Sequence, residues 1–287
     1  MAAQILDGKA VALSIRKQIK LETKAFAAET GITPCLAVIL VGNDPASEIY
    51  VKNKKLACEK CGFESREYLF PAEATQEEVI DLIKTLNADE AVNGILVQQP
   101  LPRHMDVSLI NSVIDPDKDV DAFHPVNTGK IMIGETDGLL PCTPAGIIAI
   151  LDAYELPIEG KDCVVIGRSN LVGKPAAMLM LSRNATVTMC HTRTRNLAEK
   201  TRAADILIVA AGHKDTVTAD MIKPGAVVID VGVNRTEDGI FGDVEFEGAS
   251  EVASYITPVP GGVGRMTIAM LMKNTLTAAR IQYAKKH

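Results

Sequence analysis

The chain has 287 residues, enough for about two domains of roughly 150 residues each. Hydrophobic residues make up 47% of it and charged residues 23%, which excludes a disordered chain, since disordered chains lack the apolar side chains that offset ordering entropy. The formal net charge of −6 disfavours a nucleic-acid-binding protein, which normally has a basic surface.

The apolar runs are too short to cross a membrane. The longest, such as 35–41 and 206–211, have the length of strands and fall short of the roughly 18 residues that a bilayer requires. The first nine residues show no apolar run behind a basic start, so no signal peptide is expected. These observations predict a cytoplasmic protein.

The cysteines and histidines do not have the spacing of metal ligands. Cys58 and Cys61 form a CxxC pair inside a helical pattern, but neither a second CxxC nor a nearby histidine pair completes a zinc site. We therefore expect no metal and interpret the pair as structural.

The first third of the chain alternates helix and strand signals. The continuous apolar runs at 35–41 and 94–98 are typical of buried strands, and a short strand is expected near 65–70. Thr75 and Glu78 predict a capping box at a helix start. The expected helices are 9–29, 46–61 and 75–88. This alternation is typical of a parallel sheet covered by helices.

The pattern changes between about 99 and 142, where prolines are frequent and only a short helix near 106–114 is expected. We place a domain boundary near 121–145, followed by a helix at 144–154.

A second alternating series follows this boundary. The expected strands are 162–167, 185–190, 205–210, 226–231 and 254–257, and the expected helices are 173–183, 196–203 and 218–222. A hairpin is expected around 239–246, and a final helix at 266–284 is expected to return to the first lobe.

A glycine turn joins the first strand of the second series to its helix. Gly167-Arg168-Ser169 leads to Gly173 at the helix start, which differs from the usual G-x-G-x-x-G by Ser169 and by one residue of spacing. Such a turn directs backbone N–H groups at a pyrophosphate, so it predicts a dinucleotide site; an ordinary strand–helix turn is the alternative.

The end of the next strand favours NADP over NAD. An NAD site usually has a carboxylate there for the ribose 2′-OH, whereas this chain has Thr192 and Arg193. Arg168 and Arg193 could flank a 2′-phosphate, because a guanidinium suits a phosphate better than a diol. A solvated basic turn is the alternative.

Four residues of the first lobe have the types and positions of site residues. Tyr50 and Lys54 are spaced i, i+4 and so lie on one helix face, which on this spacing alone could simply be a solvated face. Gln98 ends the strand at 94–98, where open α/β sheets bind ligands. Asp121 ends the acidic run that begins at Asp115, a run that on composition alone could be an exposed loop.

Over essentially its whole length, the chain resembles the bifunctional methylenetetrahydrofolate dehydrogenase/cyclohydrolase (FolD) family. The motifs that carry the resemblance are Pro45-Ala-Ser-x-x-Tyr50-x-x-x-Lys54, Gly94-Ile-Leu-Val-Gln98, Pro100-Leu-Pro102, Asp117-Lys-Asp-Val-Asp121, Pro141-Cys-Thr-Pro144, Gly167-Arg-Ser-x-x-Val-Gly173-Lys-Pro175 and Pro258-Val-Pro-Gly-Gly-Val-Gly264.

The resemblance implies a fold and an activity. The fold is two α/β lobes with a cleft between them, the second a Rossmann-type NADP-binding domain at 122–266 and the first a folate-binding catalytic domain at 1–121 plus 267–287. The activity is oxidation of 5,10-methylenetetrahydrofolate by NADP⁺ and hydrolysis of the methenyl product to 10-formyltetrahydrofolate, within one-carbon metabolism and purine biosynthesis. A cytoplasmic homodimer without nucleic-acid or membrane partners is also implied.

The resemblance also implies a role for individual residues. Lys54 would be central to hydrolysis, Tyr50 would stack on the aminobenzoyl group, Gln98 would hydrogen-bond Lys54, and Asp121 would anchor the pterin. The remaining positions are the folate-lining Pro260, Gly261 and Gly262 and the NADP-contacting Gly167, Arg168, Ser169, Gly173, Thr192, Arg193 and Val233.

The chain departs from the family pattern at Arg265, where the family has proline, at Ala122, where it has glycine, and at Gln99, where it has leucine. Three alternatives are a dehydrogenase with little cyclohydrolase activity, a two-lobed dehydrogenase of the shikimate or amino-acid type, and a nucleotide sensor without turnover.

Overall fold

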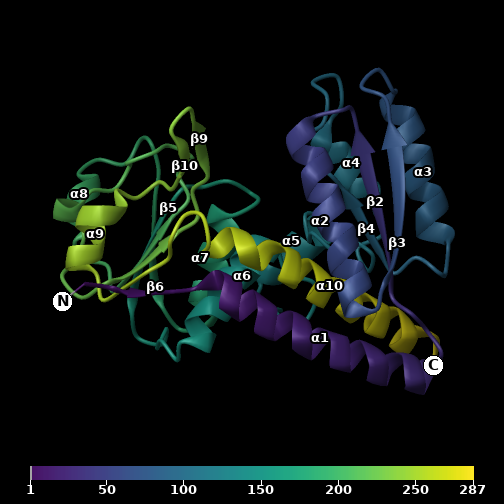
Figure 1. The fold of residues 1–287 in the computed structure, drawn as a ribbon, viewed down its shortest axis with the longest axis horizontal. Helices are drawn as coiled ribbons and strands as arrows, with labels where there is room; N and C mark the ends of the chain where they lie inside the picture. Colours follow the sequence, from purple (N-terminus) through teal and green to yellow (C-terminus); the bar gives the residue numbers. More distant parts are fainter. Residues whose placement is uncertain (1) are drawn as a thin grey trace. The chain divides into compact units, whose positions relative to one another are not determined.

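The structure, a computed structural model, describes residues 2–287 apart from the side chains of Pro45 and Ala46 (Figure 1). Residue 1, where the expected first domain begins, lies outside the described residues. Backbone contacts divide the chain into two compact units. Unit 1 consists of the residues up to Leu13, Ile131–Thr136 and Thr143–Thr267, and unit 2 of Ser14–Lys130, Asp137–Cys142 and Ile268–His287.

Unit 2 contains a parallel sheet of β2 (Cys35–Val41), β3 (Glu64–Phe70) and β4 (Gly94–Val97) in the order β3-β2-β4. Its helices are α1 (Gly8–Thr30, from Ser14 on), α2 (Pro45–Cys61), α3 (Gln76–Ala88), α4 (Val107–Val113) and α5 (Pro125–Met132, up to Lys130). Every residue of β2 is buried, as its unbroken apolar sequence predicts. Thr75 and Glu78 form the expected capping box at the start of α3.

The last helix, α10 (Met266–Lys286), packs beside α1 in unit 2 (Figure 1). Phe26 meets Tyr283 edge to face at 6.1 Å between ring centroids, and Arg280 forms an ion pair with Glu22 at 3.0 Å. The end of the chain is therefore part of the same unit as β2–β4.

Within the described residues, unit 1 has a six-stranded, fully parallel sheet in the order β1-β11-β8-β7-β5-β6. The strands are β1 (Gln4–Ile5), β5 (Asp162–Ile166), β6 (Thr186–Cys190), β7 (Ile206–Val209), β8 (Val227–Asp230) and β11 (Tyr255–Ile256). The helices are α6 (Cys142–Ala153, from Thr143 on), α7 (Gly173–Ser182), α8 (Leu197–Thr201) and α9 (Phe246–Val252). The chain runs outward from β5 to β6 and then crosses to β7 on the other side of β5, which is the order reversal of a doubly wound fold.

The structure corrects three expectations from the sequence. The hairpin expected at 239–246 is formed by β9 (Asn234–Thr236) and β10 (Gly239–Phe241), with Glu237-Asp238 as the two-residue turn. The residues from Phe246 on form α9, because Glu245 accepts a hydrogen bond from the Gly248 N–H and caps the helix. The helix expected at 218–222 is a single 3₁₀ turn, Ala219–Met221, and β1 and α5 were not anticipated.

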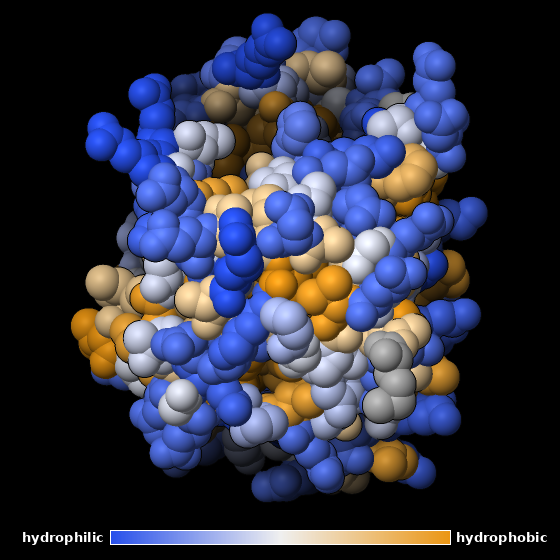
Figure 2. Space-filling view, turned by 90° about the vertical axis from the view of Figure 1, so that its left-hand side faces the viewer, coloured by the Kyte–Doolittle hydropathy of each residue, from blue (hydrophilic) through white to orange (hydrophobic). Residues whose placement is uncertain are grey.

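The surface of unit 1 seen in Figure 2 mixes hydrophilic residues with a smaller area of apolar ones, as the surfaces of folded domains generally do. Among the described residues, no helix combines the length and the apolar character needed to cross a membrane.

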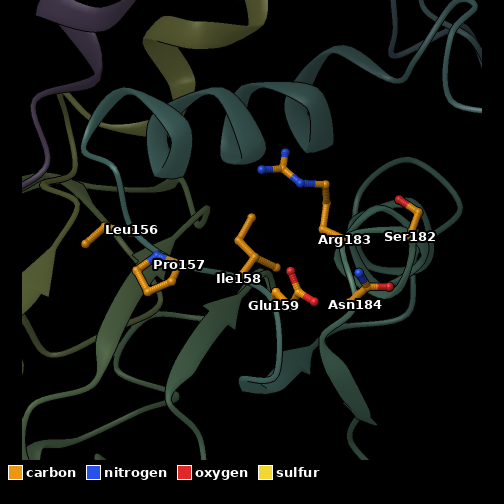
Figure 3. A pocket seen from close by; sticks show the side chains of 7 residues that line it. All are labelled: Leu156, Pro157, Ile158, Glu159, Ser182, Arg183 and Asn184. Carbon is orange, nitrogen blue, oxygen red and sulfur yellow. The ribbon is translucent and has the colours of Figure 1, made fainter.

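A pocket of about 360 Å³ lies in unit 1 at the amino ends of β5 and β6 (Figure 3). Its lining residues are Leu156, Pro157, Ile158, Glu159, Ser182, Arg183 and Asn184. Ligands of open α/β sheets bind at the carboxyl ends of the strands, so this pocket is at the wrong end for a dinucleotide. Arg183 is already paired with Asp152 of α6 through two hydrogen bonds of 2.6 and 3.2 Å.

Candidate functional sites

Lys54 is a buried lysine on α2, with 8% of its surface exposed. The helix begins after Asp44, whose carboxylate accepts hydrogen bonds from the Ser47 N–H and hydroxyl at 2.9 and 2.8 Å. It ends at Gly62, which adopts the left-handed conformation of a helix C-cap. The capping residues Asp44 and Gly62 therefore define where α2 begins and ends, and with it the place of Lys54 along the helix.

Gln98 follows β4 and accepts a hydrogen bond from Lys54 Nζ at its Oε1, with a distance of 2.7 Å. Its backbone N–H donates to Ile39 O of β2 at 2.8 Å, and its Nε2 donates to Gln99 O at 2.5 Å. Because the amide is held at both of its ends, its oxygen is directed at the lysine. The expected pairing of Lys54 with Gln98 is present.

Asp121 lies in the same unit and is fixed through its neighbours. The Cys142 thiol lies 3.5 Å from Val120 O and 3.7 Å from Asp121 Oδ1 and donates toward both. Asn274 of α10, only 5% exposed, donates through Nδ2 to Val120 O and to Leu140 O, each at 2.7 Å. The backbone next to Asp121 and the backbone next to Cys142 are thereby both hydrogen-bonded to α10.

Burial controls the charges in this cluster. It lowers the pKa of Lys54, while the nearby charge of Asp121 acts in the opposite direction. Burial also raises the pKa of Asp121, against the effect of Lys54, and raises that of Cys142 well above its usual value. Cys142 therefore stays a neutral thiol donor, and Lys54 loses its proton more easily than a solvated lysine.

Tyr50 lies one turn before Lys54 on α2 and is 44% exposed. The i, i+4 spacing predicted one helix face for the two residues, and α2 spans both without interruption. An exposed ring beside a buried amine provides a stacking surface next to a polar group.

The acidic run Asp115–Asp121 is mostly structural and is not an exposed loop. Lys118 is 6% exposed, and its Nζ donates to the carbonyls of Leu86, Asn87 and Asp89 at 2.8–2.9 Å, which satisfies the C-terminal end of α3. Asp119 is buried and accepts hydrogen bonds from the His124 N–H and Asn127 Nδ2.

The sequence reasoning missed two residues of this cluster. Neither Cys142 nor Asn274 was assigned a role from the sequence. The Pro141-Cys-Thr-Pro144 motif was a signal for the first. A lone asparagine among the apolar residues of the last helix was a weak signal for the second.

In unit 1, the turn after β5 forms a close backbone cradle. Gly167 has φ of 118°, and a Cβ there would collide with Ala210 O. A Cβ at Gly173 would collide with Gly167 O, so the start of α7 approaches the turn as only glycine permits. Ser169, in place of the second glycine, accepts at its hydroxyl from the N–H groups of Val172 and Gly173 at 3.2 and 3.3 Å. These features fit a dinucleotide pyrophosphate.

The basic residues expected beside this turn are exposed. Arg168, Thr192 and Arg193 are all accessible, and neither guanidinium forms an ion pair with another described residue. The turn after β6 is itself ordered, because the His191 N–H donates to Thr194 Oγ1 at 2.8 Å. Two uncommitted guanidinium groups at a sheet's carboxyl end are suited to a phosphate.

The Pro258–Gly264 loop and Val233 are also in unit 1. Gly262 packs against Gly8 so closely that a Cβ on Gly8 would collide with its carbonyl. Val233, which follows β8, is 52% exposed. At Arg265 the backbone N–H donates to Gly262 O at 3.1 Å, a hydrogen bond that the proline of the family pattern could not make.

Cys58 and Cys61 are both buried in unit 2, and burial raises the pKa of the Cys58 thiol to about 12. Across residues 2–287, no group of three His, Cys, Asp or Glu side chains is arranged to hold a metal ion.

Comparisons with known proteins identify two related domains along the chain. The catalytic domain of tetrahydrofolate dehydrogenase/cyclohydrolase matches residues 6–121, and the NAD(P)-binding domain of the same enzyme matches residues 141–283. The bifunctional protein FolD of Acetivibrio thermocellus is 56% identical over 287 residues, covering 100% of both chains.

Two solved structures also match the chain over nearly its whole length. The crystal structure of FolD from Campylobacter jejuni is 52% identical with a TM-score of 0.95, covering 98% of this chain and 99% of that one. FolD of Trypanosoma brucei, solved with an NADP cofactor and an inhibitor, is 39% identical with a TM-score of 0.93, covering 99% of each chain.

Proposed function

Since the chain belongs to the tetrahydrofolate dehydrogenase/cyclohydrolase family, we propose that it performs two successive reactions. It oxidises 5,10-methylenetetrahydrofolate to the 5,10-methenyl cation with NADP⁺ and then hydrolyses the cation to 10-formyltetrahydrofolate. The observation that supports this most directly is the buried Lys54, whose Nζ donates a hydrogen bond to Gln98 at 2.7 Å. Burial lowers the pKa of this lysine, and the charge of Asp121 acts against that effect.

Lys54 is the residue we assign to hydrolysis. A permanently charged ammonium would repel the cationic intermediate, whereas a lysine with a lowered pKa accepts a proton from the attacking water. The new carbon–oxygen bond forms as the carbon–N5 bond breaks. One water proton ends on N5 and the other leaves to solvent. Gln98 holds the Lys54 amine in place for this transfer.

The substrate is held by residues around this amine. We assign the exposed ring of Tyr50 to stacking on the aminobenzoyl group and the partly buried Asp121 to the pterin. The Pro260, Gly261 and Gly262 loop is assigned to the folate as well. These roles follow the family pattern residue by residue.

Bound NADP⁺ supplies the hydride acceptor for the first step. The chain's task in that step is placement, since hydride transfer needs two rings in register and no protein acid or base. Gly167, Ser169 and Gly173 form the pyrophosphate cradle, and Val233 offers an apolar side chain after β8.

We assign the preference for NADP over NAD to the adenosine end of the site. Arg168 and Arg193 flank the 2′-phosphate and Thr192 donates its hydroxyl to it. This assignment is supported by the exposure of both guanidinium groups and by the lack of a carboxylate after β6.

Three wider assignments belong to the same proposal. The folate-binding domain is 1–121 plus 267–287, and the NADP-binding domain is 122–266. The protein works as a cytoplasmic homodimer, and its product supplies one-carbon units for purine biosynthesis.

The test is turnover of methylenetetrahydrofolate with NADP⁺ and, in parallel, with NAD⁺, following reduced nicotinamide and the methenyl chromophore separately. We expect NADP-dependent reduction with little methenyl accumulation. Persistent methenyltetrahydrofolate would show a dehydrogenase without cyclohydrolase activity, even though Lys54 and Gln98 are present. Binding of NADP without reduction would replace the proposal with a nucleotide sensor.

A further inference from the structure

Two buried carboxylates lie in unit 1 outside every motif discussed so far. Asp230 is the last residue of β8 and is 4% exposed, and Asp243 follows β10 and is fully buried. Neither forms an ion pair with a described cation; backbone and amide N–H groups satisfy them instead. A buried carboxyl group that is satisfied by N–H donors fixes the segments that supply those donors.

Asp243 connects the loops that follow two neighbouring strands. Its Oδ2 accepts from the N–H groups of Ala211 and Gly212, just after β7, at 2.7 and 2.8 Å. Its Oδ1 accepts from Asn234 Nδ2, just after β8, at 2.8 Å. One carboxylate therefore sets the distance between the carboxyl-end loops of β7 and β8.

Asp230 holds Asp243 in turn. Its Oδ1 accepts from the N–H groups of Gly232 and Asp243, each at 2.9 Å, and its Oδ2 from the Val244 N–H at 2.9 Å. A Cβ on Gly232 would collide with the Asp243 carboxylate, and one on Gly242 with the Asp230 carboxylate. The two carboxylates thus pack directly against the Cα atoms of Gly232 and Gly242, where no larger residue fits.

The strand order places these loops on one particular side of the dinucleotide. The cradle at Gly167 follows β5, and the 2′-phosphate residues follow β6 on one side of it. The order reverses at β5, and a dinucleotide lies across that reversal. The loops after β7 and β8, with the exposed Val233 among them, therefore lie under the nicotinamide half.

We infer that Asp243, held by Asp230, is a positioning residue for hydride transfer. It fixes the loops at Ala211–Gly212 and Gly232–Asn234 that set the place of the nicotinamide ring. The inference rests on the proposed function. It assigns Asp243 to placement of the ring and leaves the affinity for NADP to the phosphate contacts at Gly167, Arg168 and Arg193.

The test is Asp243→Asn. An asparagine retains one acceptor oxygen and turns an NH₂ group toward N–H donors, so one of the two loops loses its partner. Because misplacement of a reacting ring acts on the chemical step, kcat of the dehydrogenase should fall by about tenfold or more, while KM for NADP⁺ changes by less than about threefold.

Three measurements on the same protein keep this outcome specific. Cyclohydrolase activity on supplied methenyltetrahydrofolate needs no NADP and should stay within about twofold of wild type. Arg193→Ala should raise KM for NADP⁺ and leave kcat of the dehydrogenase largely unchanged, the reverse of the pattern expected for Asp243→Asn. Asp205→Asn removes a carboxylate from the amino end of β7, where it holds Lys223 at 2.7 Å, and should leave kcat unchanged.

Equal loss of both activities would show a purely structural role and overturn the inference, as would an unchanged kcat or an effect confined to KM. If Asp243→Asn fails to fold, Asn234→Ser removes one donor to the same carboxylate and is judged by the same kcat criterion. Absence of NADP reduction by the wild-type enzyme would instead contradict the proposed function.

Discussion

At the scale of single residues, the cluster around Lys54 works through burial. A lysine with few water contacts holds its proton weakly, and Gln98 accepts from its amine without adding charge. Asp121 is the group that opposes this effect. The reactivity of Lys54 is thus a balance between desolvation and one carboxylate.

Asp121→Asn shifts that balance in a direction that kinetics can detect. Removing the carboxylate removes the interaction that raises the pKa of Lys54, so the pKa falls further. The limb of the cyclohydrolase pH profile that reports neutral Lys54 should therefore move to lower pH, measured as kcat at saturating methenyltetrahydrofolate. Asp117→Asn, which changes a carboxylate of the same segment paired with Lys285, is the matched control and should leave the limb in place. A limb that moves to higher pH in Asp121→Asn would contradict the assignment.

The sequence predicted Lys54, Tyr50, Gln98 and Asp121 but not the residues that hold Asp121. Cys142 and Asn274 are 132 positions apart, and both lie far from Asp121 along the chain. Their association depends on where α10 packs, and side-chain spacing within one helix or strand carries no information about that. Lys54, Gln98 and Asp121 also meet through tertiary packing, and they could be assigned because they lie in motifs of the family pattern. Asn274 lies outside those motifs, so its contact with Val120 could not be predicted.

At the scale of elements, the turn between β5 and α7 shows why the glycine motif tolerates Ser169. The serine hydroxyl accepts two N–H groups at the start of α7, whereas Gly167 and Gly173 lie where a Cβ would meet backbone carbonyls.

Gly167→Ala should raise KM for NADP⁺ by about tenfold or more, since the added Cβ forces the turn away from Ala210 and disturbs the pyrophosphate cradle. Gly225→Ala is the control. Gly225 also has a positive φ, of 82°, but a Cβ there would have nothing within 4 Å. It should cost about 1 kcal/mol of stability and leave KM unchanged. Equal effects of the two substitutions on KM would show that the cradle does not contact the cofactor.

Lys118 supports α3 from outside the helix. Lys118→Met should lower the free energy of unfolding by about 2–3 kcal/mol, because three buried or partly buried carbonyls lose their donor. Lys84→Met, which removes an exposed ion pair with Asp81, should cost less than about 0.5 kcal/mol. Denaturant titration of both variants checks the difference, and comparable losses would show that the Lys118 hydrogen bonds contribute little.

Buried apolar strands could be predicted from the sequence more accurately than the short polar hairpin. Continuous apolar runs located β2, β4, β5 and β7 to within a residue or two, because strands buried on both faces have no competing periodicity. The hairpin was placed five residues too late, since its strands are short and polar and the following residues, capped by Glu245, form a helix.

At the scale of the whole molecule, the chain passes between the two units several times. Unit 1 takes its residues from three separate segments, and α1, α5, α6 and α10 each have residues in both units. The predicted boundary region 121–145 spans the exchanges at 130/131, 136/137 and 142/143, and the exchange at 267/268 lies within one residue of the expected return at 267. The exchange at 13/14, inside α1, was not expected. Long helices that continue through a boundary leave no loop signal at it.

The residues assigned to hydrolysis lie in unit 2 and the dinucleotide cradle lies in unit 1. The two activities therefore depend on different side chains, and one substitution should separate them.

The most direct test of this claim is Lys54→Met, assayed for hydrolysis of supplied methenyltetrahydrofolate and for NADP⁺ reduction in the same preparation. We expect hydrolysis to fall to the rate without enzyme, while reduction of NADP⁺ persists and methenyltetrahydrofolate accumulates. Hydrolysis at the wild-type rate in this variant would contradict the assignment of Lys54 and with it the central claim.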